Sequence, residues 1–267
     1  MKNTLGGDTL HEQTRKIYER QHERIALDST AYNRISASYS AENWKVDPKW
    51  FVGKTALDAG CGNVGALVVR LLGLGCTKVY ACDIGADWIP KLSQHLKSKG
   101  VSESQVELRE GNVLRLPYED KSFDFVASDG VLLHLKDVTE IERGFGEGAR
   151  VCKKGGYYFT TWGSSGGLMQ GMIMPAVRNH YRKDEWFKAL IDNITPQLIH
   201  GVIDKICADS ERYGGEKLDG EFLKSQFGED FCVFLQNYIQ APQWWSNECT
   251  PEYVEGLYKE HGFVKIE

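Results

Sequence analysis

The stretch "ALDAGCGNVGAL", residues 56–67, contains the signal for the fold. A short apolar run ends at Asp58 and is followed by three glycines, Gly60, Gly62 and Gly65, before the next apolar run begins. A buried strand, a glycine turn and a helix in this order are typical of a doubly wound parallel sheet. The glycines also satisfy GxGxxG, the pattern of a dinucleotide-binding loop, which alone is weak evidence. The stretch therefore predicts a nucleoside-type ligand at a strand end.

The same rhythm continues to residue 162. Apolar strand patterns alternate with helical patterns at a spacing that indicates a parallel sheet covered on both faces. We expect strands over residues 55–59, 78–83, 105–111, 123–129 and 157–162, and helices over 64–75, 86–100 and 138–156. The predicted class is α/β, with a Rossmann-like, doubly wound, mainly parallel sheet.

The helical and strand patterns divide the chain into three regions. Residues 1–50 are predicted to form an N-terminal helical arm, and residues 51–162 with 250–267 the Rossmann-like core, ending in a helix followed by a strand. Between them, residues 163–249 are rich in aromatic residues and carry long helical patterns such as the one over 184–206. We interpret this region as a mostly helical cap inserted after the fifth strand.

The composition is that of a globular protein. Hydrophobic residues make up 42% of the 267 residues, and the formal net charge is -5. The N-terminus lacks the apolar segment of a signal peptide, and no apolar run reaches the length of a membrane span. The seven cysteines are scattered without a CxxC pair, which favours free thiols over disulfides or a zinc site. We expect a cytoplasmic protein without a metal and without membrane contact.

Two acids distinguish between ligands. Asp83 lies 21 positions after Gly62 at the end of the second strand, where an acid binds ribose hydroxyls. Asp58 lies beside the place where a pyrophosphate would rest, and a carboxylate there would repel phosphate charges. It would suit an ammonium group instead. S-adenosylmethionine carries adenosine, an ammonium and a sulfonium but no phosphate, so the pair favours this cofactor over NAD.

At these motifs the sequence resembles the class I S-adenosylmethionine-dependent methyltransferases. The matching segments are "LDAGCG", "ACDIG", "EGNVLRLPYEDKSFDFV", "SDGVLLHLKD" and "RVCKKGGYYFTT". The resemblance implies S-adenosylmethionine as cofactor, with S-adenosylhomocysteine as product. It also implies contacts from Gly60 and Gly62 to the cofactor, Asp83 to the ribose, Ile84 and Val113 to the adenine ring, Asn112 to the adenine amine, and Asp129 near the methionine end.

The sequence departs from the family pattern at three places. The third glycine, Gly65, comes one residue late, so we expect it to pack the helix. Asn112 replaces the commoner Asp, although its side-chain carbonyl can still accept a hydrogen bond from an amine. The family usually adds one more, antiparallel strand, which here is either absent or supplied by the cap.

Four residues are candidates near the acceptor. His134 is either a general base or a packed histidine behind the cofactor, and packing is the preferred interpretation. Tyr39 either covers the methionine end of the cofactor or packs in the core. Trp244 and Trp245 either form an aromatic wall for the acceptor or bury the cap against the sheet.

The charge distribution favours a small-molecule acceptor. Residues 163–267 contain 10 Lys and Arg against 16 Asp and Glu, whereas a nucleic-acid reader needs a basic face there. We therefore predict methyl transfer to an N or O atom of a small molecule by in-line displacement. The alternatives are an RNA or protein methyltransferase, an NAD-dependent oxidoreductase and a non-catalytic cofactor-binding regulatory protein. The sequence does not define the oligomeric state.

Overall fold

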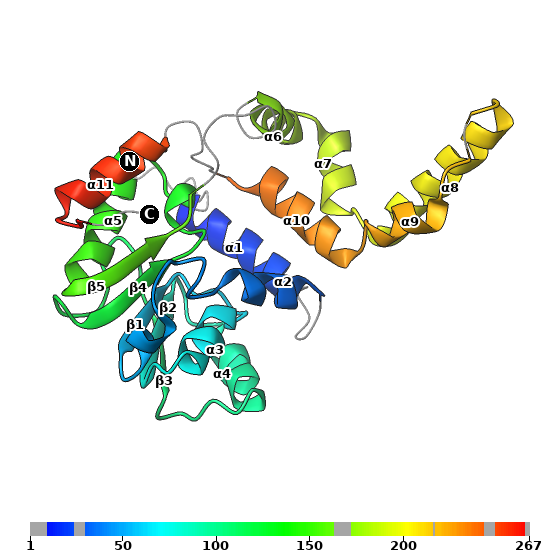
Figure 1. The fold of residues 1–267 in the computed structure, drawn as a ribbon. Helices are drawn as coiled ribbons and strands as arrows, with labels where there is room; N and C mark the ends of the chain where they lie inside the picture. Colours follow the sequence, from blue (N-terminus) through cyan, green and yellow to red (C-terminus); the bar gives the residue numbers. More distant parts are fainter. Residues whose placement is uncertain (1–9, 24–29, 163–171, 216, 243–248, 265–267) are drawn as a thin grey trace. The chain divides into compact units, whose positions relative to one another are not determined.

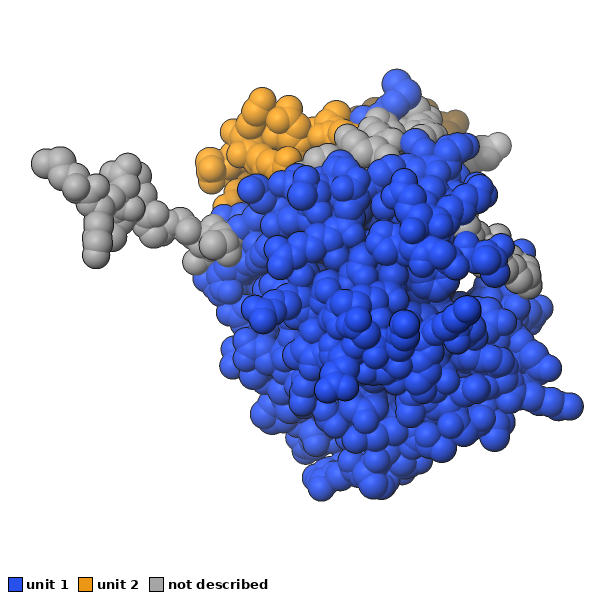
Figure 2. Space-filling view, turned by 90° about the vertical axis from the view of Figure 1, so that its left-hand side faces the viewer, with its two compact units in different colours: residues 1–172, 242–267 blue, residues 173–241 orange. Residues whose placement is uncertain are grey.

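The computed structural model describes residues 10–23, 30–162, 172–215, 217–242 and 249–264. The chain divides into two compact units, which are coloured separately in Figure 2. Residues 1–172 and 242–267 form the first unit, and residues 173–241 form the second. The predicted boundaries of the arm, core and cap remain predictions.

The first unit is built on a five-stranded parallel sheet (Figure 1). Its order is β3-β2-β1-β4-β5, so the direction of strand addition reverses between β1 and β4. The strands are β1 (Thr55–Ala59), β2 (Lys78–Asp83), β3 (Val106–Glu110), β4 (Phe123–Ser128) and β5 (Cys152–Thr160). All neighbouring strands pair in parallel. The predicted Rossmann-like α/β fold is confirmed.

Two hydrophobic clusters cover the two faces of the sheet. Ala56 on one face packs with buried residues of the helices that follow β1 and β2. Leu57 on the other face packs with the helices that follow β4 and precede the C-terminus. The helices of the first face are α3 (Ala66–Gly73) and α4 (Ile89–Ser98), and those of the second face are α5 (Val138–Val151) and α11 (Pro251–Glu260). The alternation of side chains along each strand thus produces a three-layer structure.

Two helices and a short 3-10 helix precede the sheet. They are α1 (Leu10–Glu23), α2 (Thr30–Ser38) and η1 (Pro48–Phe51). Trp44 and Phe51 insert their rings beside Phe125 of β4, with ring centroids 5.1 and 5.4 Å from that of Phe125. This contact attaches the segment after α2 to the first face of the sheet.

The second unit is helical. Its helices are α6 (Met174–Lys183), α7 (Glu185–Asp192), α8 (Pro196–Arg212), α9 (Gly220–Ser225) and α10 (Glu229–Gln240). Met174, Ile191 and Ile239 form its small core, so α6, α7 and α10 pack together. Gln236 strengthens this contact because its side-chain amide donates to the Ile191 carbonyl at 2.7 Å.

Two predicted boundaries were wrong. The helix expected over 138–156 ends at Val151, and β5 begins directly at Cys152, because Cys152 already has extended backbone and pairs with Phe123. The helical pattern over 184–206 breaks into α7 and α8, because Thr195 caps α8 and Pro196 occupies its first turn.

Three other predictions concern the cysteines, two segments near the C-terminus and membrane-spanning helices. All seven cysteines are free thiols, as predicted. Trp244 and Trp245 lie outside the described residues, as do residues 265–267 of the predicted last strand. None of the described helices is long and apolar enough to cross a membrane.

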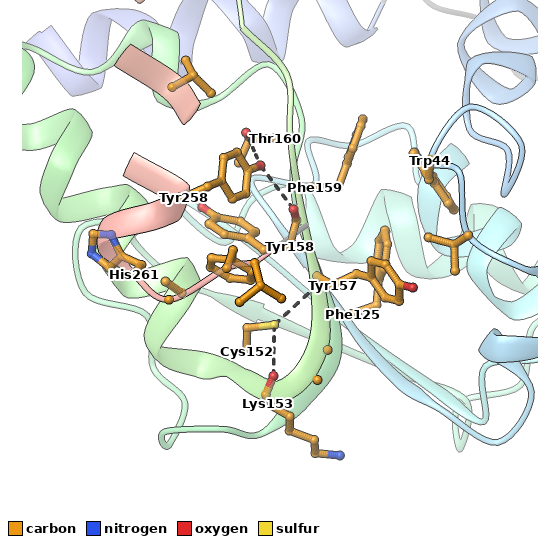
Figure 3. A pocket seen from close by; sticks show the side chains of 18 of the residues that line it. Trp44, Phe125, Cys152, Lys153, Tyr157, Tyr158, Phe159, Thr160, Tyr258 and His261 are labelled. Carbon is orange, nitrogen blue, oxygen red and sulfur yellow. Dashed lines mark hydrogen bonds between the residues drawn. The ribbon is translucent and has the colours of Figure 1, made fainter. Parts of the chain in front are cut away.

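In the described part of the sheet, β5 is an edge strand, and a groove of about 1220 Å³ lies along it (Figure 3). Its walls include Trp44, Phe159 and Tyr258, and Lys153 lies at one end. The Tyr258 hydroxyl donates to the carbonyl of Tyr158 at 3.2 Å. None of the residues predicted to bind the cofactor lines this groove.

Gly65 provides a test of helix packing. Its φ is 67°, and an added Cβ would lie 2.4 Å from Cδ1 of Leu92. Gly53 has a similar φ of 79° but nothing within 4 Å of an added Cβ. We expect Gly53→Ala to cost about 1–2 kcal/mol through backbone strain. Gly65→Ala should cost about 1–3 kcal/mol more through overpacking, as measured by urea unfolding. Equal losses would show that Gly65 is not a packing position.

Candidate cofactor site

The carboxyl ends of β1, β2 and β4 meet where the strand order reverses. Ligands of open α/β sheets bind in the crevice at this point. Asp58 is the penultimate residue of β1, Asp83 ends β2, and Asp129 directly follows β4. The structure therefore brings together three of the predicted site residues.

The turn after β1 is built from glycines in backbone conformations that favour this residue type. Gly60 and Gly62 have φ values of 92° and 57°, which residues with a Cβ rarely adopt. An added Cβ at Gly60 would lie 2.2 Å from Cγ2 of Val131. The Gly60 amide donates to the Cys82 carbonyl at 2.7 Å, which holds the turn against the end of β2. Only glycine fits at position 60, because Val131 fills the place that a side chain there would take.

Asp83 joins the glycine turn to the end of β2. Its two carboxylate oxygens accept hydrogen bonds from the amides of Gly62 and Ile84, both at 2.7 Å. Burial raises the pKa of Asp83 to about 6, although the two amide hydrogen bonds oppose this effect. Each carboxylate oxygen keeps a second acceptor position, which suits the hydroxyls of a ribose.

Asp58 is the deepest of the three acids, with 4% of its surface exposed. Burial, followed by the charges of Asp129 and Asp83, raises the pKa of Asp58 well above its usual range. A positively charged group placed beside Asp58 would stabilise its ionised form. The buried, negatively charged side chain of Asp58 therefore suits an ammonium group, the ligand that the sequence predicts for it.

Asp129 is held by two hydroxyl groups. The Tyr39 hydroxyl donates to Oδ2 at 2.5 Å, and the Thr161 hydroxyl donates to Oδ1. Thr161 Oγ1 also accepts a hydrogen bond from the Gly130 amide at 2.7 Å. Burial, then the charge of Asp129 and the hydrogen bond to it, raises the pKa of Tyr39 well above its ordinary value. Tyr39 therefore stays a neutral donor to Asp129.

Asn112 and Val113 lie in the turn after β3, the strand beside β2. The Asn112 side-chain carbonyl accepts a hydrogen bond from the Leu114 amide at 2.8 Å. One acceptor position of that oxygen remains for an adenine amine. Val113 packs against the hydrophobic cluster on the second face.

His134 ends a 3-10 helix, η2 (Leu132–His134), and is 7% exposed. The Tyr18 hydroxyl lies 2.8 Å from its Nε2, which brings α1 against the loop after β4. In α1, His11 Nε2 is 2.9 Å from a carboxylate oxygen of Glu140, and Arg15 lies 3.4 Å from Asp87. Helix α1 therefore contacts the segments that follow both β2 and β4 (Figure 1).

Sequence reasoning missed Tyr18 and Thr161. Tyr18 contacts His134 across 116 positions of the chain, and Thr161 contacts Asp129 across 32. No local motif marks either residue. The only available signal was the position of Thr161 next to the end of a strand whose carboxyl edge was expected to hold the site.

The comparisons with known proteins agree with this geometry. Residues 57–160 match the family model described as a methyltransferase domain. The demethylmenaquinone methyltransferase of Geobacillus stearothermophilus is 30% identical over 52% of this chain and 60% of its own length. Residues 57–160 are therefore a methyltransferase domain, and this part of the chain is similar to class I S-adenosylmethionine-dependent methyltransferases.

Two further matches extend the comparison. The demethylmenaquinone methyltransferase of Bacillus mycoides is 31% identical over 52% of this chain and 60% of its own length. A solved S-adenosylmethionine-dependent methyltransferase from Methanosarcina mazei is 22% identical, with 54% of this chain and 66% of that chain covered and a TM-score of 0.44. The chain spans about 60% of the length of the two curated relatives.

The family match indicates S-adenosylmethionine as the cofactor. The residues at the strand ends fit this group, since the acid at the end of β2 suits a ribose and the buried acid Asp58 suits an ammonium. Among the residues that the structure describes, no group of three or more His, Cys, Asp or Glu side chains is arranged to hold a metal ion.

Asp83 should give the stability of the protein a measurable pH dependence. Its pKa of about 6 in the folded state lies above the ordinary value of 3.8, so the folded state keeps the proton to higher pH than the unfolded state. The contribution of Asp83 to stability is therefore fully present below about pH 4 and is lost as pH rises through about 6.

We expect the unfolding free energy of the wild type, relative to that of Asp83→Asn, to fall on the order of 2–3 kcal/mol between about pH 4 and pH 6.5 without cofactor. Urea unfolding across this pH range measures the difference. A difference that does not vary with pH would contradict the raised pKa.

Proposed function

We propose that this protein transfers a methyl group from S-adenosylmethionine to an N or O atom of a small molecule. The observation that supports this function is the group of acids at the carboxyl ends of the strands, Asp58, Asp83 and Asp129, with Asp83 hydrogen-bonded to the glycine turn. This arrangement attracts a cationic nucleoside and repels a pyrophosphate.

The proposed reaction is an in-line displacement, for which bound S-adenosylmethionine supplies a methyl group already activated on a sulfonium. The protein then has to align the acceptor and exclude water. We assign the ribose to Asp83, the ammonium to Asp58, and the adenine to Ile84, Asn112 and Val113. Helix α1 contacts the loop after β4 through Tyr18 and His134, which suits a cover over the crevice.

A small-molecule acceptor has two supports. The curated relatives are named for demethylmenaquinone, which is a small molecule. The excess of acids over basic residues in positions 163–267 disfavours a nucleic-acid acceptor. The charge distribution also argues against an RNA methyltransferase, and Asp58 argues against an NAD-dependent oxidoreductase.

Cofactor binding tests the proposal directly. Isothermal titration should detect binding of S-adenosylmethionine and S-adenosylhomocysteine. Asp83→Ala should weaken both by about ten- to a hundredfold, because it removes a charge-assisted hydrogen bond. Asp209→Ala on α8 is a control of the same type, which should leave both affinities unchanged. Binding of NADH without a response to S-adenosylhomocysteine would refute the proposal.

His134 is expected to act by position rather than as a base. Because its Nε2 contacts the Tyr18 hydroxyl, His134→Ala and Tyr18→Phe should each weaken S-adenosylmethionine binding by about two- to tenfold. The rate at saturating cofactor should fall only modestly and should not recover at high pH.

Titration and label transfer from S-adenosylmethionine measure these two effects. Tyr157→Phe changes an exposed tyrosine on β5 and serves as the control. A large loss of rate with intact cofactor affinity and with rescue at high pH would make His134 the catalytic base.

A further inference from the structure

The groove along β5 takes no part in the proposed methyl transfer. It has a volume of about 1220 Å³, and in the described part of the sheet no further strand pairs with this edge. None of the three acids at the carboxyl ends of the strands lines it. The groove is therefore a separate feature of the first unit, and its lining indicates what it can bind.

The main chain of β5 presents hydrogen-bonding groups to the groove. The Thr161 amide donates to the Ser128 carbonyl of β4 at 3.4 Å, so this peptide group faces β4. Peptide groups alternate between the two edges of a strand, which turns those of Tyr158 and Thr160 away from β4. In agreement, the Tyr158 carbonyl accepts its hydrogen bond at 3.2 Å from a side chain, the hydroxyl of Tyr258. This edge can therefore pair with the main chain of an added strand.

Aromatic side chains form walls on both sides of this edge (Figure 3). Trp44 and Phe159 belong to the cluster on the first face of the sheet, with ring centroids 5.7 Å apart. Tyr258 and Phe263 belong to the cluster on the second face, with ring centroids 5.4 Å apart. Successive side chains of a strand point to opposite faces, so a strand lying beside β5 would place apolar side chains against both walls.

The end of the groove at which β5 begins is positively charged. Five basic residues line the groove against two acidic ones, although the whole protein has a net charge of -5. One of these acids, Asp120, is paired with Arg150 at 2.8 Å. The exposed Lys121 and Lys154 lie at the same end, because the Lys121 amide donates to the Arg150 carbonyl and Lys154 is the third residue of β5. This end of the groove attracts acidic side chains.

We infer that the groove binds an extended, acidic segment of a partner polypeptide, which adds to the sheet as a strand beside β5. In such complexes main-chain hydrogen bonds supply affinity, and contacts of alternate side chains supply specificity. A partner segment of about six residues, at about 3.3 Å per residue, would span the edge from Gly155 to Thr160. A second copy of β5, CKKGGYYFT, carries two lysines and no acid, so charge complementarity favours a different, acidic strand.

Fluorescence anisotropy with labelled peptides and the full chain tests the inference. The probe is a six-residue peptide of two glutamates followed by alternating valine and tyrosine, used in both sequence orders so that either strand direction is possible. One control peptide has lysine in place of glutamate, and the other is N-methylated at every peptide bond, which removes its main-chain donors. We expect the glutamate peptide, in one of its two orders, to bind at least about tenfold more tightly than both controls.

Charge reversal in the groove gives a matched pair of variants. Lys121→Glu combined with Lys154→Glu should weaken binding of the glutamate peptide about tenfold or more. Lys91→Glu combined with Lys188→Glu reverses two exposed lysines that do not line the groove, and should leave the affinity unchanged. Equal weakening by both double variants would overturn the inference, because the peptide would then respond only to the net charge of the protein.

Amide hydrogen exchange locates the peptide on the edge. The amides of Tyr158 and Thr160 should exchange freely in the wild-type protein and should slow about tenfold or more when the glutamate peptide is added. Amides already protected without peptide would show that another segment of this chain or a second copy occupies the edge, which would overturn the inference. Equal binding of the lysine or N-methylated peptide, or no binding of any peptide at about 1 mM, would also overturn it.

Discussion

The hydrogen bond from the Gly62 amide to the Asp83 carboxylate joins the two halves of the crevice. It connects the turn after β1 to the end of β2, and it exists only because the turn adopts a backbone that glycine tolerates. The same turn leads directly into α3, which packs on the sheet. Strand order and glycine turn are therefore one geometric solution.

The acids near this turn are held in an unfavourable state. Burial removes water from the carboxylates of Asp58 and Asp83, and the negative charge of Asp129 also destabilises the ionised form of Asp58. Each ionised carboxylate would therefore be more stable in water. The surrounding core compensates for this cost, because the two clusters that cover the sheet bury large apolar side chains such as Phe125 and Phe145. Buried acids with raised pKa values occur more often at functional sites than at purely structural positions.

Local patterns predicted the parts of the protein that depend on neighbouring residues. The strand ends at Ala59, next to Asp58, and at Asp83 followed from short apolar runs, and the glycine turn followed from residue type alone. The contact of Tyr18 with His134 did not, because it depends on how a distant helix packs. The start of β5 at Cys152 was missed because its pairing with Phe123, rather than its own propensity, ends the preceding helix.

The position of β5 at the edge of the described part of the sheet bears on how the molecule behaves at high concentration. An edge strand offers amides and carbonyls with which a strand of another molecule can pair, the first step of open-ended aggregation. Lys153 and the exposed Lys154 stand near the start of β5, and the pairing of β4 with β5 is irregular between Phe123 and Phe125. Lysines at an edge and a broken register both oppose such pairing. These features protect the colloidal stability of the protein, a property that is separate from its chemistry.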